Sequence, residues 1–589
     1  PKNIIATNIR LPKGKDHLKA FLAKHPEDAP LQPALETIFE GLAHADELGS
    51  LLQIEEPVEK ELRWLRERLG GQTTLATGGL TGQTRFAGQM TDEDWDAWKD
   101  GVIERLADHF TAEAEAADLV NAFFSQNAGK GVRLFELLSK RYDVVAANPP
   151  YMGSKKMSQM LKKFVELFYN PGKRDLYAAF ILRSLNLCGP NSQIAMVTQH
   201  SWLFQSSFLE LRVIGKPKKD QYCPFTGLLK DTSIQTLVHL GPNAFEEIIG
   251  EVVNCVLFTL QKRPPTLNHR IKCYRLIGAN DPLQKIRFLN DAIADDFHPS
   301  VSMPIQDRFL EIPESPMCYW LSEELIKRMS KDKLENHSKI VQQVITSDNP
   351  RFLRYFWEIT SPQKRWVNYL KAGGYNRWSG FENMVLDWHP QGSRLKNNIT
   401  KKYPYLHGNW GWLIKEETFW KDGWTYTLMA QGCFGVRKLD SGFVCDSVSP
   451  TIILNHPIDG IGAILNCRVV SYLLRSTSTE LKFRENYVGR ISLPKEIDNS
   501  ILKFLELVLV DLKKKYESND MLEIKFSENK SFHPTNLSGD IIGAINQVFQ
   551  FSALLAAFEG VSESIVFKLY QLENSDFNRI LSETGTPAG

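Results

Sequence analysis

The sequence predicts an α/β protein in which a helical region precedes a partly parallel sheet, followed by a separate α+β region and a helical tail. Three observations support this prediction. Up to about residue 126, apolar residues recur at three- and four-residue intervals, as on one face of a helix. Residues 143–147 form an apolar run followed by an apolar helix and a second strand, an order that gives parallel strands. From about residue 350 the chain is rich in Trp, Tyr, Gly and basic residues.

Composition limits the class of protein. Hydrophobic residues make up 43% and charged residues 24% of the 589 residues, which is typical of globular proteins with several domains. The net charge of +1 means that a nucleic-acid surface must be local. The eight cysteines show no C-x-x-C spacing and the histidines no metal-ligand spacing, so we expect free thiols, no metal and a cytoplasmic location. Apolar runs such as 252–260 are too short to cross a membrane.

The predicted elements of the first half follow in order. Helices are expected at 58–69 and 92–124, the second opened by the capping pair Thr91 and Asp94, with a flexible loop at 70–88 between them. A buried strand at 143–147 stops at two prolines. Asp175 caps an apolar helix that ends at Gly189-Pro190, and a strand follows at 192–199. Two further strands, 233–240 and 251–260, are placed to pair as an edge hairpin.

The second half gives a coarser prediction. Short strands, including 432–436 and 451–454, lie in the aromatic and basic region. Helices are expected at 322–329, 499–516, 539–558 and 562–572. We therefore divide the chain into five segments: a helical part (1–140), a sheet-forming part (141–262), a connector (263–349), a recognition domain (350–494) and a helical tail (495–589).

Four residues at the end of the first strand, Asn148-Pro149-Pro150-Tyr151, form the most informative motif. An amine conjugated to an aromatic ring is a poor nucleophile because its lone pair is delocalised. The side-chain carbonyl of Asn148 and the main-chain carbonyl of Pro149 can accept both amino hydrogens, which favours the more tetrahedral nitrogen of the transition state. This tetrad, as we call it below, therefore predicts a site that methylates an amino group without first deprotonating it.

The remaining members of the tetrad fit the same chemistry. The two prolines fix the backbone torsions, so that the acceptor carbonyl is in place before a substrate binds. The ring of Tyr151 offers a face on which an extruded base can stack, a contact worth ~1–3 kcal/mol. Base flipping is the expected route, because the target atom cannot be reached inside a duplex. The alternative is that the prolines merely end a strand and Tyr151 packs in the core.

A second group of candidate residues lies in the recognition domain. Around the glycine pair Gly373-Gly374, the side chains of Tyr375, Arg377 and Trp378 are suited to stacking on bases and to contacting base edges or phosphates. A basic cluster follows, suited to the DNA backbone: Arg394, Lys396, Lys401 and Lys402. The alternative is that the aromatic residues fill a small core and the basic side chains form a solvated face.

These motifs resemble a known family. The tetrad matches the catalytic motif of amino-methyltransferases, and two segments, 175–180 and 189–198, are similar to the next motifs of adenine-specific DNA methyltransferases. Segments 245–258, 371–380 and 435–443 look like parts of PglX proteins of BREX phage-defence systems. The resemblance covers most of the chain and implies a Rossmann-like class I methyltransferase sheet with a helical insertion, joined to a target-recognition domain.

The resemblance also implies a function. Asn148 at the first motif position accompanies adenine in this family, so the implied reaction is transfer of a methyl group from S-adenosyl-L-methionine to N6 of adenine in double-stranded DNA at a specific site. The implied context is restriction-modification and antiviral defence, with other BREX proteins as partners. A glycine-rich cofactor loop and an acidic ribose ligand are not recognisable before Asp143, so we expect an internal fragment with a partial Rossmann-like sheet and leave the cofactor-binding residues unassigned.

Two other functions stay open. A protein glutamine methyltransferase needs the same motif, because a side-chain amide is also planar and delocalised, but such enzymes have no role for the region after residue 350. A non-catalytic DNA-binding or scaffold subunit could keep the tetrad only as a base pocket.

Overall fold

The computed structural model describes residues 14–42, 44–53, 57–58, 60–61, 74–76, 84–86, 101–112, 119–214, 225–245, 253–279, 281–329, 332–359, 365–430, 432–477, 482–495, 497, 499–520, 522–523 and 537–585. These form two compact units, the first comprising residues 1–202 and 207–306 and the second residues 203–206 and 307–589. The predicted capping pair Thr91 and Asp94 and most of the predicted helix 58–69 lie outside the described residues.

The first unit begins with helices, as predicted. They are α1 (Gly14–Lys24), α2 (Gln32–Leu42), α3 (Ala45–Leu48) and α6 (Leu119–Ser139), with the short 3-10 helices η1 (Pro26–Leu31) and η2 (Gly49–Leu51). Residues Leu35, Ile38, Phe39 and Leu42 are all buried, which is the expected three- and four-residue spacing. The predicted loop 70–88 instead contains a short antiparallel pair, β1 (Thr74–Ala76) with β2 (Thr84–Phe86).

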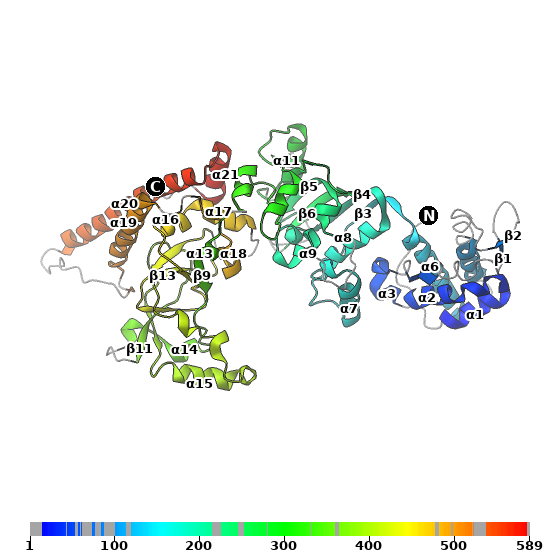
Figure 1. The fold of residues 1–589 in the computed structure, drawn as a ribbon, viewed down its shortest axis with the longest axis horizontal. Coiled ribbons are helices and arrows are strands. Elements are labelled where there is room, and N and C mark those ends of the chain that lie inside the picture. Colours follow the sequence, from blue (N-terminus) through cyan, green and yellow to red (C-terminus); the bar gives the residue numbers. More distant parts are fainter. Residues whose placement is uncertain are drawn as a thin grey trace. The chain divides into compact units, whose positions relative to one another are not determined.

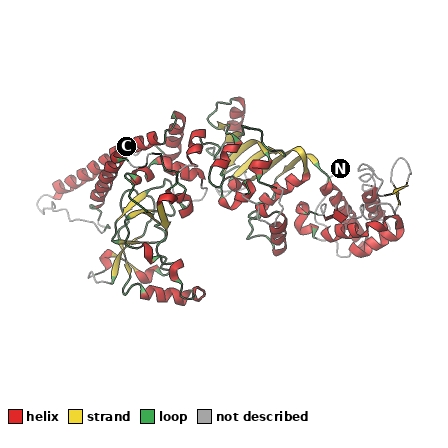
Figure 2. Ribbon diagram, in the orientation of Figure 1, coloured by secondary structure: helices red, strands yellow, loops and turns green. Residues whose placement is uncertain are grey.

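A six-stranded mixed sheet follows, in the order β3-β4-β6-β5-β7-β8 (Figures 1 and 2). Its strands are β3 (Tyr142–Ala147), β4 (Cys188–Gln199), β5 (Ser233–Gly241), β6 (Cys255–Gln261), β7 (Lys272–Arg275) and β8 (Val301–Ser302). Strands β3 and β4 are parallel, joined through α8 (Leu176–Leu187), and this pairing was predicted. Strand β6 is antiparallel to both β4 and β5.

Two predictions about this sheet were wrong. The strand β3 is not buried: Val144 is 63% exposed, because β4 is the one neighbour that β3 has among the described strands. The predicted pairing of β5 with β6 is confirmed, but they are not an edge hairpin, since β6 lies between β4 and β5 in the middle of the sheet.

The sheet also extends further along the chain than predicted. Strands β7 and β8 lie in the segment assigned to a connector, and β7 pairs in parallel with β5. The helix α11 (Pro282–Ala294) lies between them, and Asp281 caps it. The other helices of the unit are short: α7 (Gln159–Phe168), η4 (Asn170–Gly172), η5 (His200–Leu203), η6 (Ser206–Phe208), α9 (Leu209–Arg212) and α10 (Leu228–Asp231).

The second unit holds two four-stranded sheets, of orders β10-β12-β11-β15 and β14-β13-β16-β9. The strands are β9 (Ser338–Val341), β10 (Leu353–Tyr355), β11 (Trp366–Leu370), β12 (Met384–Asp387), β13 (Gly423–Tyr426), β14 (Val436–Leu439), β15 (Phe443–Cys445) and β16 (Thr451–Leu454). The predicted strand 451–454 is β16, but of the predicted strand 432–436 only Val436 is in a strand, as the first residue of β14, and Gly432 has a φ of 95°. Strand β9, predicted as connector, pairs with β16.

Helices cover these sheets and form the tail. They are α12 (Glu323–Met329), α13 (Leu334–His337), α14 (Asn349–Phe352), α15 (Ser393–Lys402), α16 (Ile461–Leu465), α17 (Arg468–Thr477), α18 (Glu485–Gly489), α19 (Ser500–Glu517), α20 (Leu537–Leu569) and α21 (Asn574–Thr584). Helices α12 and α19 match the predictions, and Asn499 caps α19. The two predicted helices 539–558 and 562–572 form one helix, α20, since no proline interrupts it.

Candidate catalytic site and recognition surface

The tetrad lies at the carboxyl end of β3, at the edge of the sheet where β4 also ends and β6 begins. Asn148 and Pro150 are exposed, Pro149 is buried and Tyr151 is partly buried. The tetrad is therefore not sealed in the core, and the amide of Asn148 is accessible to a substrate. Parallel pairing explains the location, because the carboxyl ends of β3 and β4 meet at one edge.

The ring of Tyr151 is held from one side by a second aromatic residue. Tyr177, in the first turn of α8, meets it edge to face, with 6.1 Å between ring centroids and 87° between ring planes. The hydroxyl of Tyr151 is buried with no hydrogen-bond partner of normal geometry among the described residues, although the thiol of Cys255 lies beside it. Burial, and secondarily Cys255, raise the pKa of Tyr151 above its ordinary value, so its hydroxyl stays neutral.

Tyr177 is itself fixed by a hydroxyl contact. Its Oη lies 3.0 Å from Oγ of Ser201, which follows the end of β4. Tyr177 is fully buried, and burial raises the pKa of its hydroxyl. The edge of the sheet thus brings together residues from three strands' ends and from α8, and the sequence motif alone identified only the first strand's contribution.

The loop that follows the tetrad runs antiparallel to the start of α8. The main-chain N–H of Leu176 donates to the carbonyl of Met152 at 3.0 Å, and the N–H of Ser154 donates to the carbonyl of Arg174 at 3.0 Å. Between them, Oδ1 of Asp175 accepts from the N–H of Met152 at 2.9 Å. Asp175 was predicted as a helix cap, which is confirmed, and its contact with the loop is a finding of the structure.

Two histidines lie close to the same edge. Nδ1 of His200 is 2.7 Å from Nε2 of His239, so one of the two rings donates a hydrogen bond to the other. Burial lowers the pKa of His200 to about 4. Burial, followed by the neighbouring His200, Arg275 and Lys285, lowers the pKa of His239. Both rings are neutral at physiological pH, and they pack and hydrogen bond with each other.

Metal and membrane sites were also considered. No group of three or more potential ligands that could hold a metal ion occurs in the described part of the chain. Over the same residues, no helix is both long and apolar enough to cross a bilayer.

In the recognition domain, two residues that were predicted to contact DNA instead bind a carboxylate of the protein itself. Nη2 of Arg377 forms an ion pair with Oε2 of Glu559 at 2.6 Å, and Nε1 of Trp378 donates to the other carboxylate oxygen at 2.6 Å. Trp378 is 2% exposed. Tyr375, 46% exposed, packs near the guanidinium of Arg377. Both Arg377 and Trp378 attach the domain to helix α20, so a DNA contact would require them to leave a buried partner.

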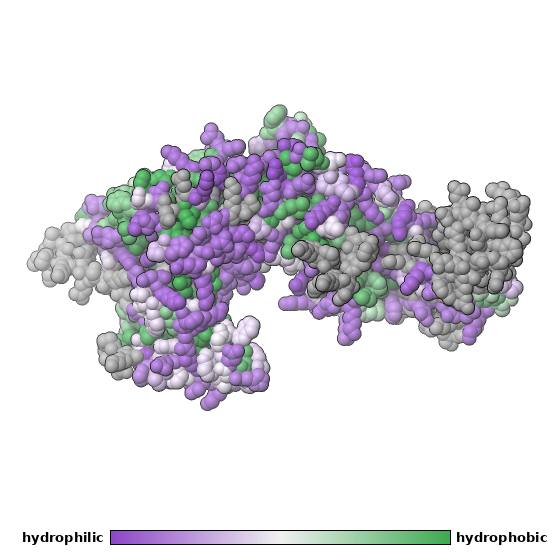
Figure 3. Space-filling model, in the orientation of Figure 1, coloured by the Kyte–Doolittle hydropathy of each residue, from purple (hydrophilic) through white to green (hydrophobic). Residues whose placement is uncertain are grey.

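The predicted basic cluster lies on α15, where exposure differs among its members. Nζ of Lys396 pairs with Glu416 at 2.6 Å, next to the rings of Trp388 and Trp410. Arg394 pairs with Asp387 at 2.6 Å but is 48% exposed. Lys401 and Lys402 are exposed in the last turn. Purple and pale residues predominate over α15 on the face that Figure 3 draws, as expected for basic and aromatic side chains.

The structure also shows exposed basic and aromatic residues of the second unit that the sequence did not single out. Arg351 donates to Oδ1 of Asn398 on α15 at 3.0 Å, which places a further exposed cation beside the helix. Tyr355 and Trp357 stack with 4.5 Å between centroids and 7° between planes, and are 41% and 47% exposed. The sequence showed only that this segment belongs to a region rich in Trp and Tyr.

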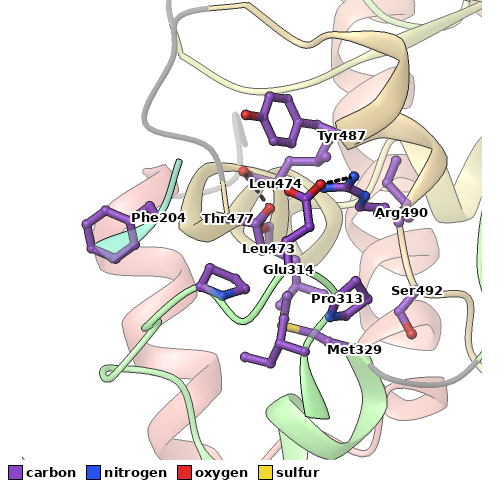
Figure 4. A pocket seen from close by; sticks show the side chains of 13 residues that line it. Phe204, Pro313, Glu314, Met329, Leu473, Leu474, Thr477, Tyr487, Arg490 and Ser492 are labelled. Carbon is purple, nitrogen blue, oxygen red and sulfur yellow. Dashed lines mark hydrogen bonds and ion pairs between the residues drawn. The ribbon is translucent and has the colours of Figure 1, made fainter. Parts of the chain in front are cut away.

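One apolar pocket lies in the second unit and contains the ion pair between Glu314 and Arg490, 2.6 Å apart (Figure 4). Its walls include Phe204, Met329, Leu473 and Tyr487. No residue of the tetrad or of its contacts lines this pocket, and its one ion pair is neutral overall.

Comparison with known families matches the region that contains the tetrad. Residues 75–243 match the family model described as Eco57I restriction-modification methylase. The matched span includes the tetrad, α8, β4 and β5, so this part of the chain, which has a mixed α/β fold, is similar to restriction-modification methylases.

The relatives are more specific. The chain is 28% identical over 443 residues to adenine-specific methyltransferase PglX of Lacticaseibacillus casei (strain Zhang), covering 70% of this chain and 35% of that protein. It is 24% identical over 458 residues to adenine-specific methyltransferase BrxX of Escherichia coli O9:H4 (strain HS), covering 75% and 35%. The resemblance to PglX-type adenine methyltransferases is therefore confirmed, and the matches span about a third of the length of these relatives.

Among solved structures, the Type IIL restriction-modification enzyme MmeI in complex with DNA is similar, with a TM-score of 0.41 and 12% identity over 76% of this chain and 58% of that one. A TM-score below 0.5 is too low to assign a shared arrangement of domains.

Proposed function

We propose that the protein transfers a methyl group to N6 of adenine in duplex DNA at a specific site. The observation that carries this proposal is the accessible amide of Asn148 beside the half-buried ring of Tyr151, within a region that matches a restriction-modification methylase. The names of the two relatives support adenine as the base.

The residues of the tetrad have separate roles in this proposal. The Asn148 side-chain oxygen and the Pro149 carbonyl accept the two amino hydrogens of an everted adenine, and the ring of Tyr151 stacks on the base. Pro149 is buried, so its carbonyl is held by the packing around it before the base arrives. Because the hydrogen bonds strengthen as the nitrogen becomes tetrahedral, they lower the barrier without a general base.

The implied cofactor, S-adenosyl-L-methionine, supplies the electrophilic methyl group. The described residues fit the half of the site that holds the amine, since they place two acceptors and an aromatic face together. Among those same residues we assign none to the cofactor, because no glycine-rich loop or acidic residue of the expected kind adjoins β3 in the described part of the chain.

We assign DNA recognition to the second unit, over the exposed face of α15. Arg394, Lys401 and Lys402 lie on this face, and Arg351 adjoins it through Asn398. Cations suit the phosphate backbone, and the stacked pair Tyr355 and Trp357 offers an aromatic surface to bases. We assign Lys396 a structural role beneath this surface, because its charge is already paired with Glu416. The role in BREX defence, other BREX proteins as partners and a cytoplasmic location belong to the same proposal.

The test uses the natural full-length protein, duplex DNA and labelled S-adenosylmethionine. We expect Asn148→Ala to abolish transfer while the affinity for DNA changes by less than about twofold, since the amide acts on the amine alone. Asn290→Ala, which removes an exposed amide from α11, serves as the matched control and should leave transfer unchanged. Undiminished transfer by Asn148→Ala would refute the assigned role.

The substrate that is methylated distinguishes the proposed function from the two alternatives. Transfer to a glutamine peptide and not to DNA would point to a protein methyltransferase, and tight DNA binding with no transfer to any substrate would point to a scaffold subunit.

A further inference from the structure

The loop after the tetrad has three hydrogen bonds to the start of α8, and one of them depends on a side chain. The two main-chain bonds join Leu176 to Met152 and Ser154 to Arg174. The third runs from the N–H of Met152 to Oδ1 of Asp175 at 2.9 Å. Met152 directly follows Tyr151, so this bond is the first fixed point of the chain after the aromatic ring.

The same carboxylate oxygen serves the helix. Oδ1 of Asp175 also accepts from the N–H of Tyr177, at the longer distance of 3.5 Å. The ring of Tyr177 is the one that meets Tyr151 edge to face. The carboxylate of Asp175 therefore accepts from the N–H of Met152, which follows Tyr151, and from the N–H of Tyr177, whose ring packs against Tyr151.

The strand before the tetrad gives less support. In the described residues β3 pairs only with β4, and both Asn148 and Pro150 are exposed. The contacts of the loop after Tyr151 therefore add to the support that the two prolines and the ring of Tyr177 give to this residue.

We propose that Asp175 is a positioning residue for methyl transfer: by holding Met152 and Tyr177 together, it sets the plane of the Tyr151 ring on which the target base stacks. This inference rests on the proposed function and adds to it a residue outside the tetrad. Asp175 touches neither the base nor the methyl group.

The chemistry of the carboxylate predicts which replacements preserve the contact. An asparagine has an oxygen of the same reach and can accept from both N–H groups. A serine is a good helix cap but is too short to hold the loop as well, and an alanine does neither. Asp175→Ser therefore keeps the helix cap and removes the loop contact. This variant still tests the proposal if Asp175→Ala fails to fold.

The experiment compares these three variants in the natural full-length protein. Methyl transfer gives kcat and KM for duplex DNA, and hydrogen exchange of the amides of residues 151–156 reports on the loop without requiring activity. The matched control is Asp281→Ala, which removes the same kind of cap from α11, where Oδ1 of Asp281 accepts from the N–H of Gln284 at 2.8 Å.

We expect Asp175→Ser and Asp175→Ala to lower kcat about 100-fold, the scale of a misplaced reacting group, with KM for DNA within about twofold. Exchange of the loop should rise about tenfold or more in both. Asp175→Asn should stay within about threefold of the wild type, and Asp281→Ala should change neither readout.

The inference is overturned if Asp175→Ser keeps a normal kcat, or if Asp175→Asn is as impaired as Asp175→Ala, which would make charge the important property. If the wild-type protein itself transfers no methyl group, the proposed function fails, and the loop contact is judged by exchange alone: faster exchange in Asp175→Ser supports it, and unchanged exchange removes it.

Discussion

The guanidinium of Arg377 and the carboxylate of Glu559 lie 2.6 Å apart, each side chain being less than one-fifth exposed. The residues are far apart in sequence, and this ion pair attaches the recognition domain to helix α20. Glu559 also accepts from the indole N–H of Trp378, so that one carboxylate holds two consecutive side chains. A segment whose composition suggested DNA contact instead forms an internal attachment.

We therefore expect Glu559→Ala to lower the free energy of unfolding of the second unit by roughly 3 kcal/mol, since the guanidinium loses its ion-pair partner and the indole N–H loses its acceptor. Chemical denaturation would measure the change. Lys515→Ala is the control, because the pair of Lys515 with Asp511 is more than half exposed and should contribute less than about 0.5 kcal/mol. Equal effects of the two substitutions would contradict the internal role of Arg377 and Glu559.

On α15, exposure predicts which lysines contact DNA. Lys401→Ala should weaken binding to all duplexes and reduce the slope of log affinity against log salt by about 1, as for the loss of one phosphate contact. Lys396→Ala should leave that slope unchanged, because Glu416 already neutralises this lysine. Binding isotherms at several salt concentrations decide the point, and a larger slope change for Lys396→Ala would reverse the assignment.

The Tyr151 side chain allows its ring and its hydroxyl to be tested separately. Because the hydroxyl is buried without a hydrogen-bond partner among the described residues, Tyr151→Phe should keep kcat within about threefold and not lower stability. Tyr151→Ala removes the stacking face and should cost ~1–3 kcal/mol in binding of the everted base. Fluorescence of 2-aminopurine at the target position follows base eversion, and similar signals from the two variants would exclude stacking on Tyr151.

The histidine pair predicts how stability depends on pH. His200 has a folded pKa of about 4 against an ordinary value of 6.5, so the unfolded chain binds a proton more readily. The neutral form of His200 therefore stabilises the fold above pH 6.5, and this stabilisation is lost as the pH falls toward 4. By pH 5 the loss amounts to about 2 kcal/mol. Urea unfolding at pH 7 and pH 5 measures the loss. His200→Asn should show a smaller loss over this window, and an equal loss would show that other groups are responsible.

Local sequence patterns predicted the core of the site well. Strand β3, the cap at Asp175, helix α8 and strand β4 follow from short-range signals, because hydrophobic periodicity, capping residues and prolines act within a few residues. The tetrad was recognisable for the same reason, since its four members are consecutive and each has a chemical role.

Contacts between distant segments were not predictable in this way. The placement of β6 between β4 and β5, and of β9 beside β16, depends on pairing partners many residues apart. The same holds for Tyr177 and Ser201 around Tyr151, and for Glu559 beside Arg377. A basic or aromatic side chain looks alike in sequence whether it faces a phosphate or a buried carboxylate.

The sequence by itself predicted the chemistry that we propose for this protein, from two carbonyl acceptors stiffened by proline, an aromatic residue after them, and a strand before them. Tertiary structure decided which side chains are free to use that chemistry. It exposed Asn148, paired Lys396 and Arg377 internally, and joined Met152 to Asp175. The physical reason is that burial and ion pairing are set by whichever distant residues pack together, and a carboxylate within 3 Å outweighs the intrinsic preference of a cation for DNA.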